Sequence, residues 1–126
     1  MVMSLPLEIA KREIKPGIVV LEIKGAIHMG AASQKIEQHV EQSLGRSENR
    51  MIFDLSKVTF VDSGGLGAIV RCFSKLKKAG GSLRLTGVQG MIATVMKITQ
   101  VDKVIEVFPT PVEAAENFLT ESEGRG

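Results

Sequence analysis

The sequence predicts a single α/β domain with a mixed sheet of about four to five strands, an N-terminal hairpin, and about four helices packed mainly on one face. Two β-rich segments lie next to each other at the start of the chain, and strand-like and helix-like segments alternate after them. The chain has 126 residues, which is the length of one domain. Hydrophobic residues make up 44% of it, enough to fill one core.

The first part of the chain is predicted to form the hairpin and then a helix. Residues 9–15 and 18–24 are the two β-rich segments, and Pro16-Gly17 between them is typical of a turn. In residues 30–44, apolar side chains recur on one helical stripe, and Gly45 marks the end. We therefore expect an amphipathic helix lying on the sheet.

The middle of the chain is predicted to contain a buried strand, a connection and a second helix. Residues 51–55 form a short apolar run, and residues 56–60 are interpreted as a link that crosses to the next helix. Helical spacing then appears in the apolar residues Leu66, Ile69, Val70, Phe73 and Leu76. Gly80-Gly81 is expected to stop this helix.

The last part continues the alternation of strands and helices. Residues 82–86 are predicted to be a strand, residues 88–99 a third helix, and residues 104–108 a last short strand. A final helix is expected over residues 111–119, with Pro111 in its first turn.

The chain contains one domain in this interpretation. It is assigned to residues 7–119, with an N-terminal extension at residues 1–6 and a small, polar, flexible C-terminal tail at residues 120–126. No internal repeat or linker divides it.

Composition excludes several classes of function. The formal net charge is only +2, and its one local cluster, Lys75, Lys77 and Lys78, falls at a predicted helix end where cations complement the helix dipole. The chain has no Trp or Tyr, so it lacks the aromatic platforms on which single-stranded nucleic acids stack, and no nucleic-acid partner is expected.

The single cysteine points to a reducing compartment. Cys72 lies inside an amphipathic helix, so neither a disulfide nor a metal site is predicted, and no cofactor is expected. The start of the chain lacks the features of a signal peptide, and no apolar run is long enough to span a membrane. We expect a soluble cytoplasmic protein with no membrane insertion.

Ser63 is the strongest candidate functional residue. In the run from Val61 to Gly67 it stands where the buried strand gives way to the second helix. Free backbone N–H groups and the helix dipole favour an anion there, typically by about 0.3–1 kcal/mol at an exposed site. Gly64 and Gly65 lack a Cβ and would let a partner approach closely. The position suits a serine that gains and loses phosphate.

Other interpretations of this run remain open. Asp62 is expected to cap the second helix, which would also orient the serine, and the glycines could be simple turn residues. Asp-Ser-Gly-Gly also occurs around the nucleophile of chymotrypsin-like proteases, but this chain is too short for two β-barrels, and Val61 stands where a nucleophile elbow needs glycine. The histidines that could serve as a base are His28 and His39. A Ser63–His28 pair is disfavoured.

The motifs resemble the STAS-domain family, and within it the bacterial anti-sigma factor antagonists. The family pattern is an apolar strand with Asp-Leu-Ser, then a short apolar link, and then the run Asp-Ser-(Ser/Thr/Ala/Gly)-Gly-Leu-Gly. It is matched by Phe53-Asp54-Leu55-Ser56, by Val58-Thr59-Phe60-Val61, and by Asp62 to Gly67. Gly80-Gly81, Leu83-Arg84-Leu85, the helix around residues 88–98, and Val104 to Phe108 also resemble the family, so the likeness spans roughly residues 7–119.

One segment departs from the pattern. Family members often have Gly-Glu-(Leu/Ile)-Asp after the second strand, whereas this chain has Gly25-Ala26-Ile27-His28. Both carboxylates are absent, and a histidine, a residue type that could add pH sensitivity, stands at position 28.

The resemblance implies a regulatory cycle. In the family the serine after the motif's aspartate is phosphorylated, which corresponds to Ser63. The unphosphorylated antagonist binds an anti-sigma factor that is also a serine kinase, which frees the sigma factor; a serine phosphatase reverses the phosphorylation. The domain would be a switch and not an enzyme, either a monomer or a weak dimer.

Specific partner-binding residues follow from this comparison. Asp62 would orient the phosphoacceptor, Gly64, Gly65 and Leu66 would shape the docking loop, and Met91 and Ile92 would widen the docking surface unless they belong to the core. Two alternatives are a non-switching STAS subunit of a signalling scaffold or lipid-transport complex, and a serine hydrolase that a fluorophosphonate would label at Ser63.

Overall fold

The computed structural model describes residues 6–124. The elements in chain order are β1 (Glu8–Lys15), β2 (Ile18–Ile27), α1 (Ala31–Gly45), β3 (Arg50–Val61), α2 (Ser63–Lys78), β4 (Ser82–Thr86), α3 (Gly90–Ile98), a 3-10 turn (Val101–Lys103), β5 (Val107–Phe108) and α4 (Pro111–Gly124). Within this described range, no helix is long and apolar enough to cross a membrane.

The five strands form one mixed sheet in the order β1-β2-β3-β4-β5. β1 and β2 are the antiparallel arms of the hairpin, and each later strand runs parallel to the one before it. The prediction of a mixed α/β sheet with an N-terminal hairpin and four helices is therefore confirmed.

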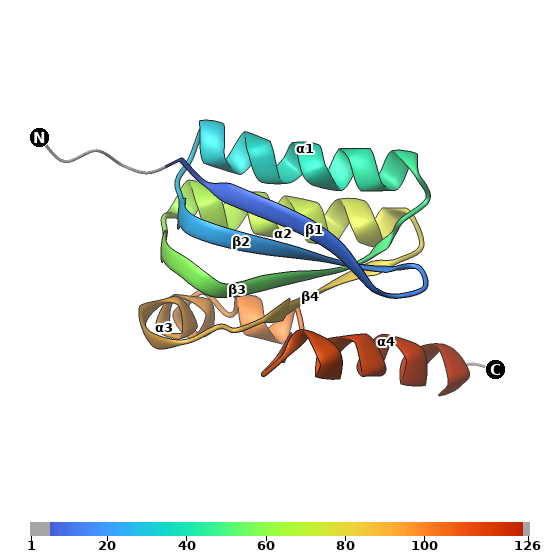
Figure 1. Ribbon diagram of the computed structural model, residues 1–126. Helices are drawn as coiled ribbons and strands as arrows, with labels where there is room; N and C mark the ends of the chain where they lie inside the picture. Colours follow the sequence, from blue (N-terminus) through green and yellow to red (C-terminus); the bar gives the residue numbers. More distant parts are fainter. Residues whose placement is uncertain (1–5, 125–126) are drawn as a thin grey trace, which may run out of the picture.

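The helices are divided between the two faces of the sheet. α1 and α2 lie side by side over one face, whereas α4 lies against the other and α3 beside the end of the sheet (Figure 1). The larger core is formed between the sheet and the α1–α2 pair, and buried side chains of α3 join it. Of the four helices, α1 and α2 cover one face, α3 contributes to the same core from the end of the sheet, and α4 covers the opposite face.

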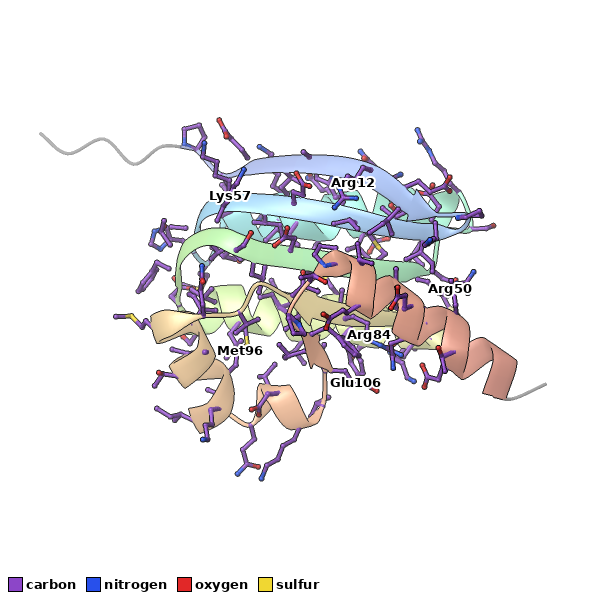
Figure 2. All side chains as sticks on the ribbon, turned by 60° about the horizontal axis from the view of Figure 1, so that its bottom comes forward. Arg12, Arg50, Lys57, Arg84, Met96 and Glu106 are labelled. Carbon is purple, nitrogen blue, oxygen red and sulfur yellow. The ribbon has the colours of Figure 1, made fainter. Side chains whose placement is uncertain are left out.

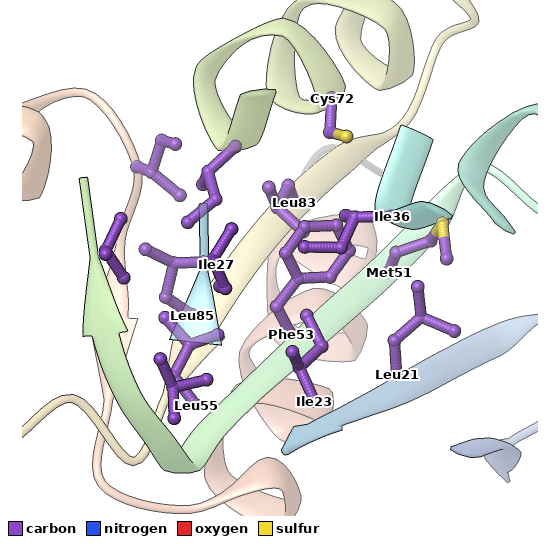
Figure 3. Packing of buried hydrophobic residues seen from close by; sticks show 14 of the residues in the cluster. Leu21, Ile23, Ile27, Ile36, Met51, Phe53, Leu55, Cys72, Leu83 and Leu85 are labelled. Carbon is purple, nitrogen blue, oxygen red and sulfur yellow. The ribbon is translucent and has the colours of Figure 1, made fainter. Parts of the chain in front are cut away.

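The larger core is aliphatic with one central aromatic ring. Phe53 on β3 lies between Leu21 on β2 and Leu85 on β4, and Ile36 and Cys72 reach it from α1 and α2 (Figure 3). All five side chains are fully buried. This packing fixes the two helices, and hence the start of α2, against the strands.

A smaller core holds α4 in place. Ile18, Val20 and Ile52 on the second face of the sheet pack against Ala114, Ala115 and Phe118 of the helix. Burying the apolar side of α4 against these strands stabilises the helix far more than its intrinsic propensity could.

A buried arginine adds polar contacts to this packing. Arg84 on β4 lies next to α4 (Figure 2), where its guanidinium stacks 4.3 Å from the Phe118 ring centre and its Nε donates to Asn117 Oδ1 at 3.0 Å. Nη2 forms an ion pair with Glu121.

α4 does not end at Leu119 as predicted but continues to Gly124, and the Arg84–Glu121 ion pair lies within the added part of the helix. The segment 120–124, predicted to be flexible tail, is helical; residues 1–5 of the predicted extension and residues 125–126 lie outside the described residues.

Four other boundaries differ from the prediction by two residues or more. β2 ends at Ile27 and not at residue 24. β3 includes residues 56–60, predicted to be a link, because β2 continues alongside it as far as the pair Ile27↔Val61. β5 is limited to Val107–Phe108, since the chain before it forms the 3-10 turn. α3 begins at Gly90, two residues later than predicted, because Gln89 is extended.

Candidate functional site

Ser63 lies at the edge of the sheet where three connections meet. β2, β3 and β4 are parallel, so their carboxyl ends, and the loops that follow them, share one edge. These loops lead into α1, α2 and α3. Ser63 is the first residue of α2 and its side chain is exposed. The structure therefore places the predicted phosphoacceptor at an accessible helix N-terminus.

Asp62 caps α2 and also fastens the neighbouring loop. Its Oδ1 accepts a hydrogen bond from Gly65 N at 2.7 Å, and Met29 N donates to Oδ1 and Oδ2 at 3.1 and 3.0 Å. These N–H donors, Gly65 first and then Met29, lower the pKa of the Asp62 carboxyl. Because Asp62 supplies the cap, the Ser63 hydroxyl is not needed for it.

The two glycines allow α2 to start in contact with the end of β2. A Cβ on Gly65 would lie 2.0 Å from the carbonyl oxygen of Ile27, and one on Gly64 would lie 2.4 Å from Cβ of Met29. Asp62 N also donates to Ile27 O at 3.3 Å. The sequence led us to expect a close approach by a partner; in the structure these glycines admit the chain's own β2–α1 loop.

The predicted partner-binding residues separate into buried and exposed groups. Leu66 and Ile92 are only 9% and 5% exposed and belong to the larger core. For Ile92 this agrees with the alternative that its side chain is part of the core, and Leu66 can shape the docking loop only by packing beneath it. Met91, one position earlier on α3, is 69% exposed. Of the apolar candidates, Met91 alone presents its side chain to solvent.

Sequence reasoning missed two exposed apolar side chains beside the serine. Met29 is 75% exposed in the β2–α1 loop, and Phe60 is 40% exposed near the end of β3. Met29 contacts Asp62 through its backbone, and Phe60 lies two residues before it. Their positions immediately after β2 and immediately before the motif were the available signal.

His28 faces the cap rather than standing apart from it. Its Nδ1 lies 3.6 Å from Oδ2 of Asp62, and its ring centre lies 5.2 Å from that of Phe60. A hydrolytic base would have to engage the Ser63 hydroxyl, and the contacts seen for the imidazole are with these other two side chains.

A metal-binding cluster or a reactive cysteine would be a further kind of site. In the described part of the chain, no group of three or more His, Cys, Asp or Glu side chains could hold a metal ion. Burial raises the pKa of the Cys72 thiol to about 12, so this cysteine is not a nucleophile at neutral pH.

Comparison with known proteins identifies the family. A family model described as "STAS domain" matches residues 10–114. A Thermotoga neapolitana protein that carries the provisional name of anti-sigma factor antagonist is 29% identical over 76 residues, which are 60% of this chain and 67% of the relative.

Solved structures share the fold. A protein of Thermotoga maritima with the same provisional name superposes with a TM-score of 0.79 at 22% identity, covering 87% of this chain and 93% of that one. SpoIIAA, named an anti-sigma factor antagonist, matches in its unphosphorylated form with a TM-score of 0.68 at 15% identity, covering 90% of this chain and 98% of that one. The phosphorylated form of the Bacillus protein matches with a TM-score of 0.68 at 16% identity, covering 87% and 98%. At such identities these likenesses show the fold alone. Because the family model matches residues 10–114, which are most of the chain, this chain belongs to the STAS domain family.

Proposed function

We propose that this protein is an anti-sigma factor antagonist that works as a phosphorylation-controlled binding module. When Ser63 is unmodified, it binds an anti-sigma factor that is also a serine kinase, and a sigma factor is released. Phosphorylation of Ser63 ends this complex, and a serine phosphatase restores it. The observation that carries the proposal is the exposed Ser63 hydroxyl at the start of α2, with Asp62 supplying the cap.

The electrostatic effect of one phosphoryl group is large enough for such a switch. Phosphorylation adds roughly −1.5 to −2 charges at neutral pH at a single point of the surface. Weakening a complex 100-fold requires only about 2.7 kcal/mol. The free N–H groups of the helix N-terminus accommodate the anion in the free protein, so the modification opposes binding without unfolding the domain.

Exposed apolar side chains around Ser63 supply a docking surface. Met29, Phe60 and Met91 come from the loops and strand end at the same edge of the sheet, and each is at least 40% exposed. Flexible methionine side chains adapt to a partner surface, and aromatic side chains bury a large area on contact. A partner that docks at this edge of the sheet would contact such side chains together with the exposed Ser63.

The test of the site is intact-mass spectrometry of the protein isolated from its native cells under conditions that preserve phosphate, followed by site mapping. We expect a substoichiometric gain of one phosphoryl group on Ser63, lost in Ser63→Ala. A Ser63→Ala protein phosphorylated to the same stoichiometry would show that the site is elsewhere.

The effect on binding is measured with the kinase that phosphorylates the protein. Ser63→Ala should keep its affinity, and Ser63→Asp should weaken it. Ser74→Asp is the matched control, because Ser74 is an exposed serine further along the same helix and the substitution adds the same charge. Equal weakening by both aspartates would point to net charge rather than to the Ser63 surface.

A second candidate function is a non-switching STAS subunit of a signalling scaffold or lipid-transport complex. It is favoured by Ala26 and His28, which stand where the resemblance leads us to expect acidic residues at the kinase-facing edge. Stable co-purification with a complex that is indifferent to ATP, together with Ser63 unmodified under all growth and stress conditions, would support this function instead.

A further inference from the structure

We propose that His28 is the binding partner of the phosphoryl group on Ser63, so that the charge presented by the modified site depends on pH. The proposal rests on the proposed function in taking Ser63 as the phosphoacceptor. It adds a residue and a form of regulation that the serine alone does not have.

The backbone places Ser63 beside the loop that carries His28. Both chain neighbours of Ser63 contact Met29, the residue after His28. The Asp62 carboxylate accepts from Met29 N, and a Cβ on Gly64 would lie 2.4 Å from Cβ of Met29. The residues immediately before and after Ser63 therefore both lie against this loop. A phosphoryl group on Ser63 would lengthen the serine side chain.

The loop that carries His28 is held in position. The backbone carbonyl oxygen of His28 accepts hydrogen bonds from Ser33 N at 3.2 Å and from Ser33 Oγ at 2.8 Å. These bonds tie the loop to the first turn of α1. The imidazole is 52% exposed, with Nδ1 3.6 Å from Oδ2 of Asp62 and the ring against Phe60. The side chain is thus directed toward the start of α2 while remaining open to an incoming group.

The charges around the imidazole leave a place for a phosphate. Among the described residues, Asp62 is the charged side chain that His28 contacts; Phe60 on β3 and Ser33 on α1 are uncharged. The Asp62 carboxylate already accepts backbone N–H groups of Met29 and Gly65. A phosphate adds roughly two negative charges and three acceptor oxygens. An imidazolium next to it can donate a hydrogen bond to one of these oxygens.

A phosphoserine and a histidine that lie next to each other interact electrostatically, and this interaction couples their protonation. Phosphoserine loses its second proton near pH 6, and imidazole titrates near neutral pH. Pairing favours the imidazolium and the phosphate dianion together, so the imidazole midpoint rises and the phosphate midpoint falls. For exposed groups we expect shifts of about half a pH unit to one pH unit.

The pairing would change what a partner meets. When His28 is protonated, the imidazolium neutralises part of the charge that phosphorylation adds at Ser63. The modified protein would then oppose its partner less at pH 6 than at pH 8. The switch would be more complete in an alkaline cell than in an acidified one.

The test uses protein with phosphoserine incorporated at position 63 during synthesis through a reassigned codon. No native kinase is needed, so a result here is independent of whether cells modify Ser63. The ³¹P NMR titration of this protein is compared with that of its His28→Gln variant. We expect the phosphate midpoint to be about half a pH unit lower with His28 present. Equal midpoints would overturn the proposal.

The histidines give a second readout that needs no substitution. His28 and His39 are the chain's two histidines, and His39 lies on α1, partly buried, as an internal control. Phosphoserine at position 63 should raise the NMR titration midpoint of His28 and leave that of His39 unchanged. No shift of His28, or an equal shift of both, would overturn the pairing. An absence of phosphate in native cells would instead contradict the proposed function.

Discussion

Gly65→Ala should destabilise this protein, although alanine is the better helix former. The added Cβ would lie 2.0 Å from the Ile27 carbonyl oxygen and 2.9 Å from its carbonyl carbon. Ordinary contact begins near 3.4 Å. The obstructing atoms belong to the backbone of β2, so no side-chain rotation can relieve the clash. The start of α2 must move away from the sheet by about 1 Å.

The magnitude follows from three effects. Overpacking of this kind costs about 1–3 kcal/mol. Stretching the backbone hydrogen bond to Ile27 O, which is already 3.3 Å long, costs about 1 kcal/mol more. The higher helix propensity of alanine returns about 1 kcal/mol. We expect a net loss of about 2 kcal/mol, which lowers the Tm of a domain of this size by roughly 8 °C.

Gly67→Ala is the matched control, because it is the same change two residues later in the same helix. Its Cβ would lie 3.3 Å from Nη1 of Arg71, the mobile end of a long side chain. We expect Gly67→Ala to be neutral or to raise stability by up to about 1 kcal/mol. Thermal and urea denaturation followed by circular dichroism measure both variants. A Gly65→Ala protein as stable as the unsubstituted chain would refute the packing argument.

Two further predictions concern titratable groups. The pKa of Asp62 is lowered in the folded protein, so its ionised form contributes stability that is present at neutral pH and lost as the pH falls below about 4. The test compares the urea unfolding midpoints of the unsubstituted chain and of Asp62→Asn from pH 3 to 7. The difference between the two midpoints should become smaller toward pH 3. A difference that does not change with pH would contradict this prediction. For Cys72, a pKa raised to about 12 by burial leaves roughly one thiolate in ten thousand at pH 8. Ellman's reagent should react with it quickly in urea and very slowly in the native protein, and fast native labelling would show that α2 exposes this face.

The sequence predicted the order of elements better than their lengths. The Pro16-Gly17 turn and the later alternation of strands and helices led to the correct sheet. Residues 56–60 were taken for a link because exposed side chains such as Ser56 and Lys57 interrupt the apolar run. They are strand because β2 extends beside them past the end of β4, a tertiary relation that local spacing does not express.

The position and cap of the candidate serine were predictable from the sequence, and the exposed surface around it less so. The strand-to-helix change around Ser63 located both the serine and its cap. The sequence could not decide whether Ile92 belongs to the docking surface or to the core, because α3 is apolar on most of its sides, and spacing could not tell buried Ile92 from exposed Met91. The role of Gly65 could not be predicted either, since the atom that it avoids, Ile27 O, lies 38 residues earlier in the chain.

The order of the sheet bears on how the protein is made. Strand order in space equals strand order in the chain, so each strand emerging from the ribosome finds its neighbour already synthesised. The sheet can grow outward from the hairpin, one edge at a time, and no strand has to insert between two others. α4 comes last and can settle over Ile18, Val20 and Ile52 only when they are in place. A ribosome-bound chain that stops before α4 would therefore expose this apolar patch. Docking of α4 covers the patch and so removes a surface that favours aggregation.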